Sequence, residues 1–300
     1  MNVAVLEERR AGGVVGWLAS TDHKRIGLLT LATALVFFVA SGILAILIRS
    51  ELLEPGMQLM SKDRYNQVFT MHGSGMIYLA ITPLALGLGV YLVPLQIGAA
   101  EIAGPRLTLL GYWLYVAGGL TMFLGFATNH GAGKDGWTAY YPLSSAAHTT
   151  GNGMDLWIVG VFLSVLGMTI VAATVLATVL RLRAPGLTML RLPVFSWTMV
   201  ATCLMVVTSF PVLLVAMALL EYDRRFGGIF SGTHGPEAWQ HLFWFYGHPV
   251  VYVMFFPFVG AVGEVIATFS RRRFFGYRAH VAGKMELRQK IQKVTLESTR

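Results

Sequence analysis

The sequence predicts an all-α membrane protein whose chain crosses a bilayer six times. Of its 300 residues, 55% are hydrophobic and only 13% are charged, whereas soluble domains carry about 25% charged residues. The mean hydropathy is +0.61. Six apolar runs are each long enough to supply the roughly 20 residues that a transmembrane helix needs. Because backbone groups in lipid must be hydrogen-bonded within their own segment, we expect these runs to be helices packed in one bundle.

The chain divides by composition into a lead-in, 1–25, a bundle, 26–270, and a basic tail, 271–300. The lead-in begins with charged residues and lacks a long apolar region, so it does not resemble a cleavable signal. The tail is too highly charged to be a seventh span. The six expected spans cover 26–48, 72–96, 107–128, 155–180, 193–219 and 242–269.

The positive charges predict the orientation of the bundle. The lead-in, the connections between spans 2 and 3 and between spans 4 and 5, and the tail together hold 17 of the 23 Lys and Arg residues. Cytoplasmic segments are enriched in Lys and Arg, so both termini are expected in the cytoplasm of a multi-pass protein of the cell inner (plasma) membrane. The net charge of +8 then reflects topology and contact with anionic lipid, not nucleic-acid binding.

The single cysteine and one histidine bear on possible metal sites. Cys203 lies in the middle of a span, so an internal disulfide is impossible and no cysteine-based metal site is indicated. His72 opens the second span in the string FTMHGSG. A neutral imidazole can ligate haem iron, and Gly73 and Gly75 would leave room for a large flat group. The alternative is an interface histidine paired with a backbone carbonyl.

A second histidine lies in the sixth span. His248 and Tyr252 are four residues apart and so share one helix face. Pro249 and Pro257 each remove a helix hydrogen bond, which favours an internal site in a kinked span. A metal-ligating histidine beside a phenol suits redox chemistry. The alternative is a pair of satisfied polar groups at a helix interface.

Three further charged residues lie at the ends of spans. Glu264 is either a proton-relay group or a carboxylate that reaches the lipid headgroups. Arg49 either extends to the headgroups or pairs with a buried group. Asp155 begins the fourth span, where the helix dipole favours a carboxylate.

Six motifs in a fixed order resemble one protein family. The chain is similar to subunit I of the haem–copper oxidases, in the branch of cytochrome c oxidases and related quinol oxidases. The resemblance covers about residues 17–278 and implies the first half of a twelve-helix bundle. Its motifs are STDHKRIG, FTMHG, PLQIGAAEIAGPRL, GWTAYYPLSS, RLRAPGLTMLRLP and QHLFWFYGHPVVY.

The resemblance implies roles at a low-spin haem. His72 matches one axial ligand of that haem, and Arg49 matches the arginine near its ring substituent. Trp137 matches an aromatic residue close to the haems. The chain is thus expected to bind part of a haem site.

The resemblance also implies roles at a copper centre that faces a high-spin haem. His248 matches one copper ligand, and Tyr252 matches the tyrosine that the family joins covalently to it. Trp244 matches the tryptophan that packs against the copper. The family's remaining copper and haem ligands belong to its later spans, so the chain is expected to be a truncated subunit I that does not reduce oxygen alone.

The implied function is electron transfer from cytochrome c through haem to O2, which is reduced to water at the haem–copper centre. The expected partners are subunit II-like and subunit III-like chains, cytochrome c or quinol, O2 and the lipid bilayer. Alternatives are a quinol oxidase subunit I, or a non-catalytic membrane relic or assembly partner that pairs with a separate chain for spans 7–12. A solute transporter is disfavoured, since matching discontinuous helices are not evident.

The proton path of the family is altered in this sequence. Glu101 and Glu264 are the candidate proton-path carboxylates, Glu101 standing where the family has an entry aspartate. The usual glutamate two residues after the copper-ligand histidine is Val250, which can carry no proton. Whether protons are pumped is therefore left open. The resemblance also implies that path asparagines are replaced at Val90, Thr108, Leu109 and Ile170.

Overall fold

The computed structural model describes residues 13–272, 274–277 and 279, and all regular secondary structure in these ranges is helical. Six helices are long and apolar enough to cross a membrane, as predicted. The second of these spans is built from three consecutive segments. The spans are α3 (His23–Glu51), then α4 (Lys62–Ser74), the π-helical segment η1 (Gly75–Ile81) and α5 (Thr82–Ile97), then α6 (Pro105–Leu124), α7 (Asn152–Arg181), α8 (Val194–Phe226) and α9 (Gly235–Phe269).

The helices extend beyond the apolar runs that predicted them. Helix α3 begins at His23 because the Asp22 carboxylate accepts a hydrogen bond from the Lys24 amide, 2.8 Å. The second span begins at Lys62, ten residues before His72, so that His72 lies well inside a helix and not at its start. Hydropathy locates the part of a helix that lies in lipid, whereas capping locates where the helix begins.

The lead-in contains a short helix that the sequence pattern did not predict. Helix α2 (Val14–Leu18) precedes α3, and the Arg25 guanidinium lies 5.6 Å from the centre of the Trp17 ring. Residues 1–12 and 280–300 lie outside the described ranges, so the expected extent of the lead-in and of the basic tail stays a prediction. Two short 3-10 turns, Gly125–Ala127 and Met189–Arg191, complete the described helical segments.

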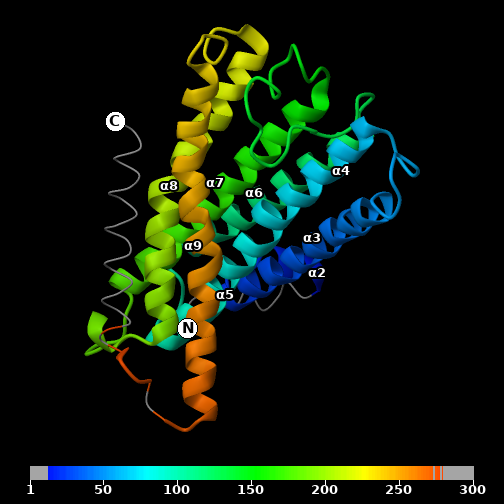
Figure 1. Cartoon of the computed structure of the whole chain (residues 1–300). Coiled ribbons are helices and arrows are strands. Elements are labelled where there is room, and N and C mark those ends of the chain that lie inside the picture. The colour runs from blue at the N-terminus through cyan, green and yellow to red at the C-terminus, as the bar shows by residue number, and fades with distance from the viewer. Residues whose placement is uncertain (1–12, 273, 278, 280–300) are drawn as a thin grey trace.

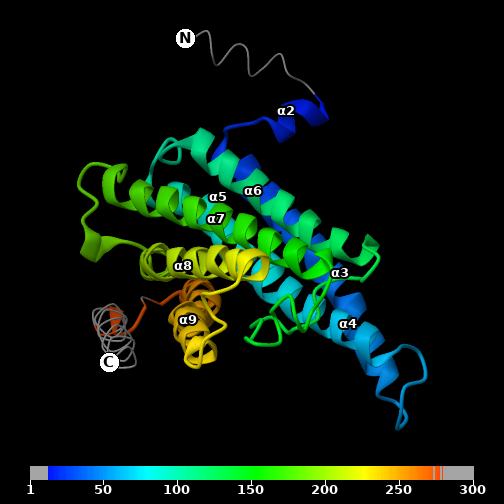
Figure 2. The same cartoon turned by 90° about the horizontal axis from the view of Figure 1, so that it is seen from above.

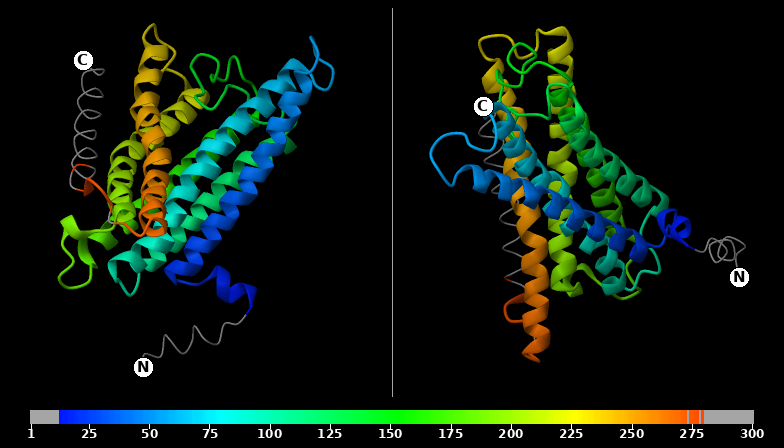
Figure 3. Two further views of the ribbon diagram at one scale, coloured as in Figure 1. Left: turned by 60° about the horizontal axis from the view of Figure 1, so that its bottom comes forward. Right: turned by 90° about the vertical axis from the view of Figure 1, so that its right-hand side faces the viewer.

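Consecutive helices pack against each other and place α3 and α9 at the margins of the bundle. Helices α6, α7 and α8 follow one another side by side, with α9 next to α8 (Figures 1 and 2). Helices α3 and α4 run alongside each other at the opposite margin (Figure 3). In the most apolar windows, only 17% of residues in α3 and 28% in α9 are buried, against 61% in α7. These two helices therefore present their apolar side chains outward.

Glycines allow α6 and α7 to approach backbone to backbone. A Cβ on Gly118 would lie 2.5 Å from the Gly160 carbonyl oxygen, and a Cβ on Gly167 would lie 2.4 Å from the Gly111 carbonyl oxygen. Small residues at such contacts are typical of membrane helix packing, where van der Waals contact drives association. These glycines therefore let α6 and α7 pack in close contact.

Candidate functional site

His72 is held by a hydrogen bond to the neighbouring helix. Its Nδ1 atom lies 2.9 Å from the carbonyl oxygen of Ser41 in α3. A carbonyl only accepts hydrogen bonds, so Nδ1 carries the proton and Nε2 keeps a lone pair. No hydrogen bond from Nε2 is formed within the described ranges of the chain. A metal-ligating imidazole usually donates its other ring N–H to a carbonyl or carboxylate, which fixes the tautomer and the ring orientation.

The two glycines that follow His72 serve helix packing. A Cβ on Gly75 would lie 2.0 Å from the Ser41 hydroxyl oxygen, and one on Gly73 would lie 3.7 Å from the Trp137 side chain. Ser41 therefore packs tightly against Gly75, whereas Gly73 is only in ordinary van der Waals contact with Trp137. That the two glycines leave room for a flat group stays a prediction. An apolar pocket of about 210 Å³ lies beside Met76, one helical turn beyond His72, and its lining includes Phe258 of α9 but not His72.

The π-helical segment directly after His72 is stabilised by side-chain hydroxyls. The Thr82 hydroxyl donates to the Ile77 carbonyl, 2.9 Å, and the Tyr115 hydroxyl donates to the Leu79 carbonyl, 2.7 Å. A wider helical turn leaves carbonyls less well bonded, and π-helical turns are often found at functional sites. These bonds keep the irregular turn in place beside His72.

An aromatic cluster connects the His72 region to α9. The Trp137 ring lies edge-on to Trp244, with ring centres 5.9 Å apart, and edge-on to Phe243, 5.3 Å. The Trp244 indole nitrogen donates to the Tyr140 hydroxyl, 2.8 Å. The connection between α6 and α7 thus fixes Trp137 and Trp244 beside each other, and Trp137 also borders Gly73.

His248 and Tyr252 lie together on the outward side of α9. Their ring centres are 5.0 Å apart at an interplanar angle of 60°. His248 is exposed and Tyr252 is half-buried, whereas Val250 is fully buried in the bundle core. Helix α9 is continuous through Pro249. The imidazole therefore faces away from the six helices, and the valine faces into them.

The described part of the chain does not complete a metal site around His248. Within it, no group of three or more His, Cys, Asp or Glu side chains is placed to hold a metal ion. His72 and His248 each stand as a single candidate ligand. Cys203 is buried in the core as a free thiol and contributes nothing to either site.

Glu264 is tied into the end of the bundle. Its Oε1 accepts a hydrogen bond from the Phe195 amide, 2.8 Å, and its Oε2 accepts one from the Gln96 side chain, 2.7 Å. Phe195 lies in the first turn of α8, whose N-cap, Pro193, has no capping side chain. Glu264 of α9 thus supplies the capping acceptor that the residues next to the start of α8 do not provide. Neither sequence interpretation of Glu264 predicted this role.

The remaining predicted residues take simpler positions. Arg49 is exposed in the last turn of α3, and Glu101 is exposed in the connection after α5. Thr108 is buried and donates to the Thr174 hydroxyl, 3.0 Å. Val90 is fully buried, and Leu109 and Ile170 are half-buried. No hydrogen bond joins Glu101 to Glu264 in the described ranges.

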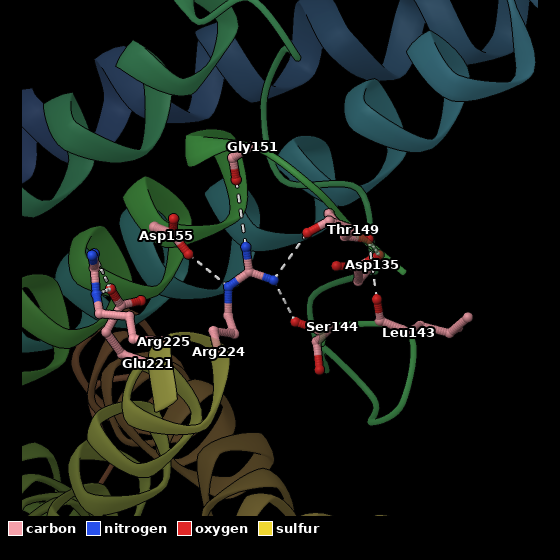
Figure 4. A network of polar contacts seen from close by, with 9 residues as sticks. All are labelled: Asp135, Leu143, Ser144, Thr149, Gly151, Asp155, Glu221, Arg224 and Arg225. Carbon is pink, nitrogen blue, oxygen red and sulfur yellow. Dashed lines mark hydrogen bonds and ion pairs between the residues drawn. The ribbon is translucent and has the colours of Figure 1, made fainter. Parts of the chain in front are cut away.

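A buried polar network, absent from the sequence prediction, fastens the connection between α6 and α7 (Figure 4). The Arg224 guanidinium donates to Asp155, 2.6 Å, and to the carbonyl oxygen of Ser144, 2.6 Å. The Thr149 hydroxyl donates to one oxygen of Asp135, while the other oxygen is buried without a partner. Burial raises the pKa of the Asp135 carboxyl above its usual value. Asp155 was expected only as a helix-start carboxylate.

Comparison with known proteins identifies the family. The family described as cytochrome c and quinol oxidase polypeptide I matches residues 25–285. A putative cytochrome c oxidase subunit 1-beta of Streptomyces coelicolor is 49% identical over 266 residues, which is 88% of this chain and 46% of that protein. A cytochrome c oxidase subunit 1 of Corynebacterium efficiens is 46% identical over 269 residues, with the same coverage.

The chain spans about half the length of the curated relatives that it matches. The matched region contains five of the six long helices in full, all but the first two residues of α3, and both candidate histidines. On this evidence the chain belongs to the cytochrome c and quinol oxidase polypeptide I family.

Proposed function

We propose that this chain is the part of subunit I of a terminal respiratory oxidase that contributes one axial ligand to a low-spin haem and one ligand to copper. The observation that carries the proposal is the His72 tautomer, in which Nδ1–H is bonded to the Ser41 carbonyl and Nε2 keeps a lone pair that can bind a metal. Family membership supports it. Haem, when bound, supplies one-electron transfer that no side chain here can replace.

The residues of the chain have distinct parts in this proposal. His72 would bind the iron of a haem through Nε2, and the hydrogen bond from Nδ1 to Ser41 holds the ring in one orientation. Trp137 closes the space beside Gly73 and excludes water from that side. Arg49, exposed eight residues after Ser41, is the cation nearest the end of α3 and would pair with a charged haem substituent.

The copper site is incomplete in the described residues. His248 alone holds copper weakly, so no step of the reaction is assigned to it in this chain. We propose that the further ligands belong to the portion of subunit I that the relatives have and this chain does not span. The outward direction of His248 suits such a partner, and Tyr252 places a phenolic proton donor next to the imidazole.

The rest of the proposed activity rests on the family. We propose cytochrome c as electron donor, in keeping with relatives named as cytochrome c oxidase subunits, O2 as acceptor, and subunits II and III as partners in the plasma membrane. The distribution of Lys and Arg supports the proposal that both termini lie in the cytoplasm. Val250 is buried and apolar, so protons reach the centre by a route that avoids it. Glu101, being exposed, is the more accessible of the two candidate proton-uptake carboxylates.

The test is a reduced-state optical spectrum, with and without CO, of the complex isolated from native membranes through a tag on this chain. The proposal predicts two haems, one of which binds CO, together with oxygen consumption from reduced cytochrome c. Replacement His248→Ala should abolish oxygen consumption and leave the low-spin haem band. A complex without haem would refute the proposal, and consumption from quinol alone would correct the electron donor.

A further inference from the structure

A polar pocket lies away from the haem and copper candidates. It has a volume of about 440 Å³ and opens between the first turn of α4 and the connection that follows α6. Small-molecule sites typically measure about 300–1,000 Å³. Every lining residue is polar or glycine, and the side chains with donor groups include Arg64, Asn129, His130, Lys134 and Thr150. None of the residues assigned above to haem, copper or proton transfer lines it.

One buried glutamine holds the two walls of this pocket together. The Gln67 side-chain nitrogen donates to the His130 carbonyl, 3.2 Å, and to Asp63, 2.8 Å. Gln67 is only 4% exposed. On the opposite wall Gly131 has φ +76°, and a Cβ there would lie 2.1 Å from the Gln67 side-chain oxygen. The pocket is therefore built by tertiary contacts and is not a gap between loose surface chains.

The charges in the pocket leave a cation available. Both oxygens of Asp63 are engaged, one by the Lys134 ammonium and the other by Gln67. The Arg64 guanidinium makes one hydrogen bond, to the neutral Gln67 amide oxygen, 3.3 Å. An arginine has five N–H donors, so most of those on Arg64 remain for a ligand. The one carboxylate is thus neutralised by Lys134, and Arg64 makes the pocket positive.

We propose that this pocket binds a phosphate group, either as the free anion or as the headgroup of an anionic phospholipid. A guanidinium binds two phosphate oxygens at once, and Lys134 adds a compact charge. Asn129, His130 and Thr150 supply neutral donors for the remaining oxygens. Arg64 lies in the first turn of a membrane-spanning helix, five residues before the exposed Phe69, so the pocket is close to the end of the span, where headgroups lie.

The first test titrates the purified protein with inorganic phosphate at constant ionic strength and follows thermal unfolding. Phosphate should raise the unfolding temperature of the wild type. In Arg64→Gln, the phosphate concentration needed for the same rise in unfolding temperature should be about tenfold higher or more, since a charge-assisted hydrogen bond is lost. The matched control is Lys62→Gln, which changes an exposed cation on the same helical turn that does not line the pocket. Acetate should need at least about tenfold higher concentrations than phosphate to raise the unfolding temperature by the same amount.

The second test separates the two sources of phosphate. Native mass spectrometry of protein from nanodiscs should show phosphatidylglycerol retained by the wild type and lost from Arg64→Gln, with phosphatidylcholine retained by neither. Retention of phosphatidylglycerol would identify the headgroup, and a response to inorganic phosphate alone would identify the free anion. Asn129→Ala, which removes a neutral donor, is the second variant. Equal behaviour of Arg64→Gln and Lys62→Gln in both tests would overturn the proposal.

Discussion

His72 of α4 and Ser41 of α3 are joined by a hydrogen bond of 2.9 Å between the imidazole Nδ1 and the carbonyl oxygen. Because the bond runs between two helices, the spacing of those helices sets the direction of Nε2. Gly75 controls the spacing, since a Cβ there would lie 2.0 Å from the Ser41 hydroxyl. The orientation of the candidate haem ligand thus depends on a glycine three residues away.

Replacement Gly75→Ala should push α3 and α4 apart and destabilise the protein by about 1–3 kcal/mol, the usual cost of overpacking. Thermal unfolding in detergent, followed by tryptophan fluorescence, measures this. Gly42→Ala is the control, because a Cβ on Gly42 meets nothing within 4 Å. The added substitution Ser41→Ala, which removes the clashing hydroxyl, should restore part of the loss. Equal stability of Gly75→Ala and Gly42→Ala would show that the contact is unimportant.

Replacement Glu264→Ala should leave the Phe195 amide and the Gln96 side chain without their acceptors. We expect a loss of about 1–2 kcal/mol, in the range of a lost helix cap. The free energy of opening that protects the Phe195 amide from hydrogen exchange should fall by at least the same amount, so its exchange should be faster. Glu101→Gln, at an exposed carboxylate, should change neither quantity. An unchanged exchange rate in Glu264→Ala would mean that Glu264 does not cap α8.

Replacement Arg224→Met should remove the cation from the network around Asp155 (Figure 4). Losing one partner of a buried ion pair costs about 3–5 kcal/mol. Because Asp155 is 22% exposed, we expect the low end of this range, about 3 kcal/mol. The adjacent Arg225 is 59% exposed and pairs with Glu221, which is 19% exposed. Because the Arg225 cation is largely solvated, Arg225→Gln should cost less, about 1 kcal/mol. Chemical denaturation of both variants gives the comparison. Similar losses for the two arginines would contradict the assigned network.

Asp135 should make stability depend on pH. Burial raises its pKa in the folded protein above the unfolded value of about 3.9. The folded state therefore binds more protons between these two values, and stability falls as the pH rises from about 4 through the folded pKa. Asp135→Asn should remove this fall, while Glu54→Gln, at an exposed position, should keep it. The check is the unfolding temperature measured from pH 4 to pH 7.

The sequence predicted the number of spans because hydropathy alone sets which segments can lie in lipid. It also placed His248 and Tyr252 on one helix face, since that follows from helical spacing, and the structure confirms their contact. The start of the second span was misplaced by ten residues at Lys62, because polar residues continue a helix beyond the lipid.

The tertiary partners could not be predicted. No spacing rule links Glu264 to the Phe195 amide, which is 69 residues away. The acceptor for His72 is a backbone carbonyl, so no residue type marks it in the sequence. For the network around Arg224 the sequence contains one signal. Arg224 is a cation in the string EYDRRF near the end of a span, where a cation is expected to pair with a carboxylate.

The haem content of the isolated complex tests the central claim most directly. We predict a low-spin haem band in the reduced-minus-oxidised spectrum of the wild type. His72→Ala should abolish that band, whereas His148→Ala, at an exposed histidine in the connection before α7, should keep it. A low-spin band that persists unchanged in His72→Ala would contradict the assignment of His72 as a haem ligand.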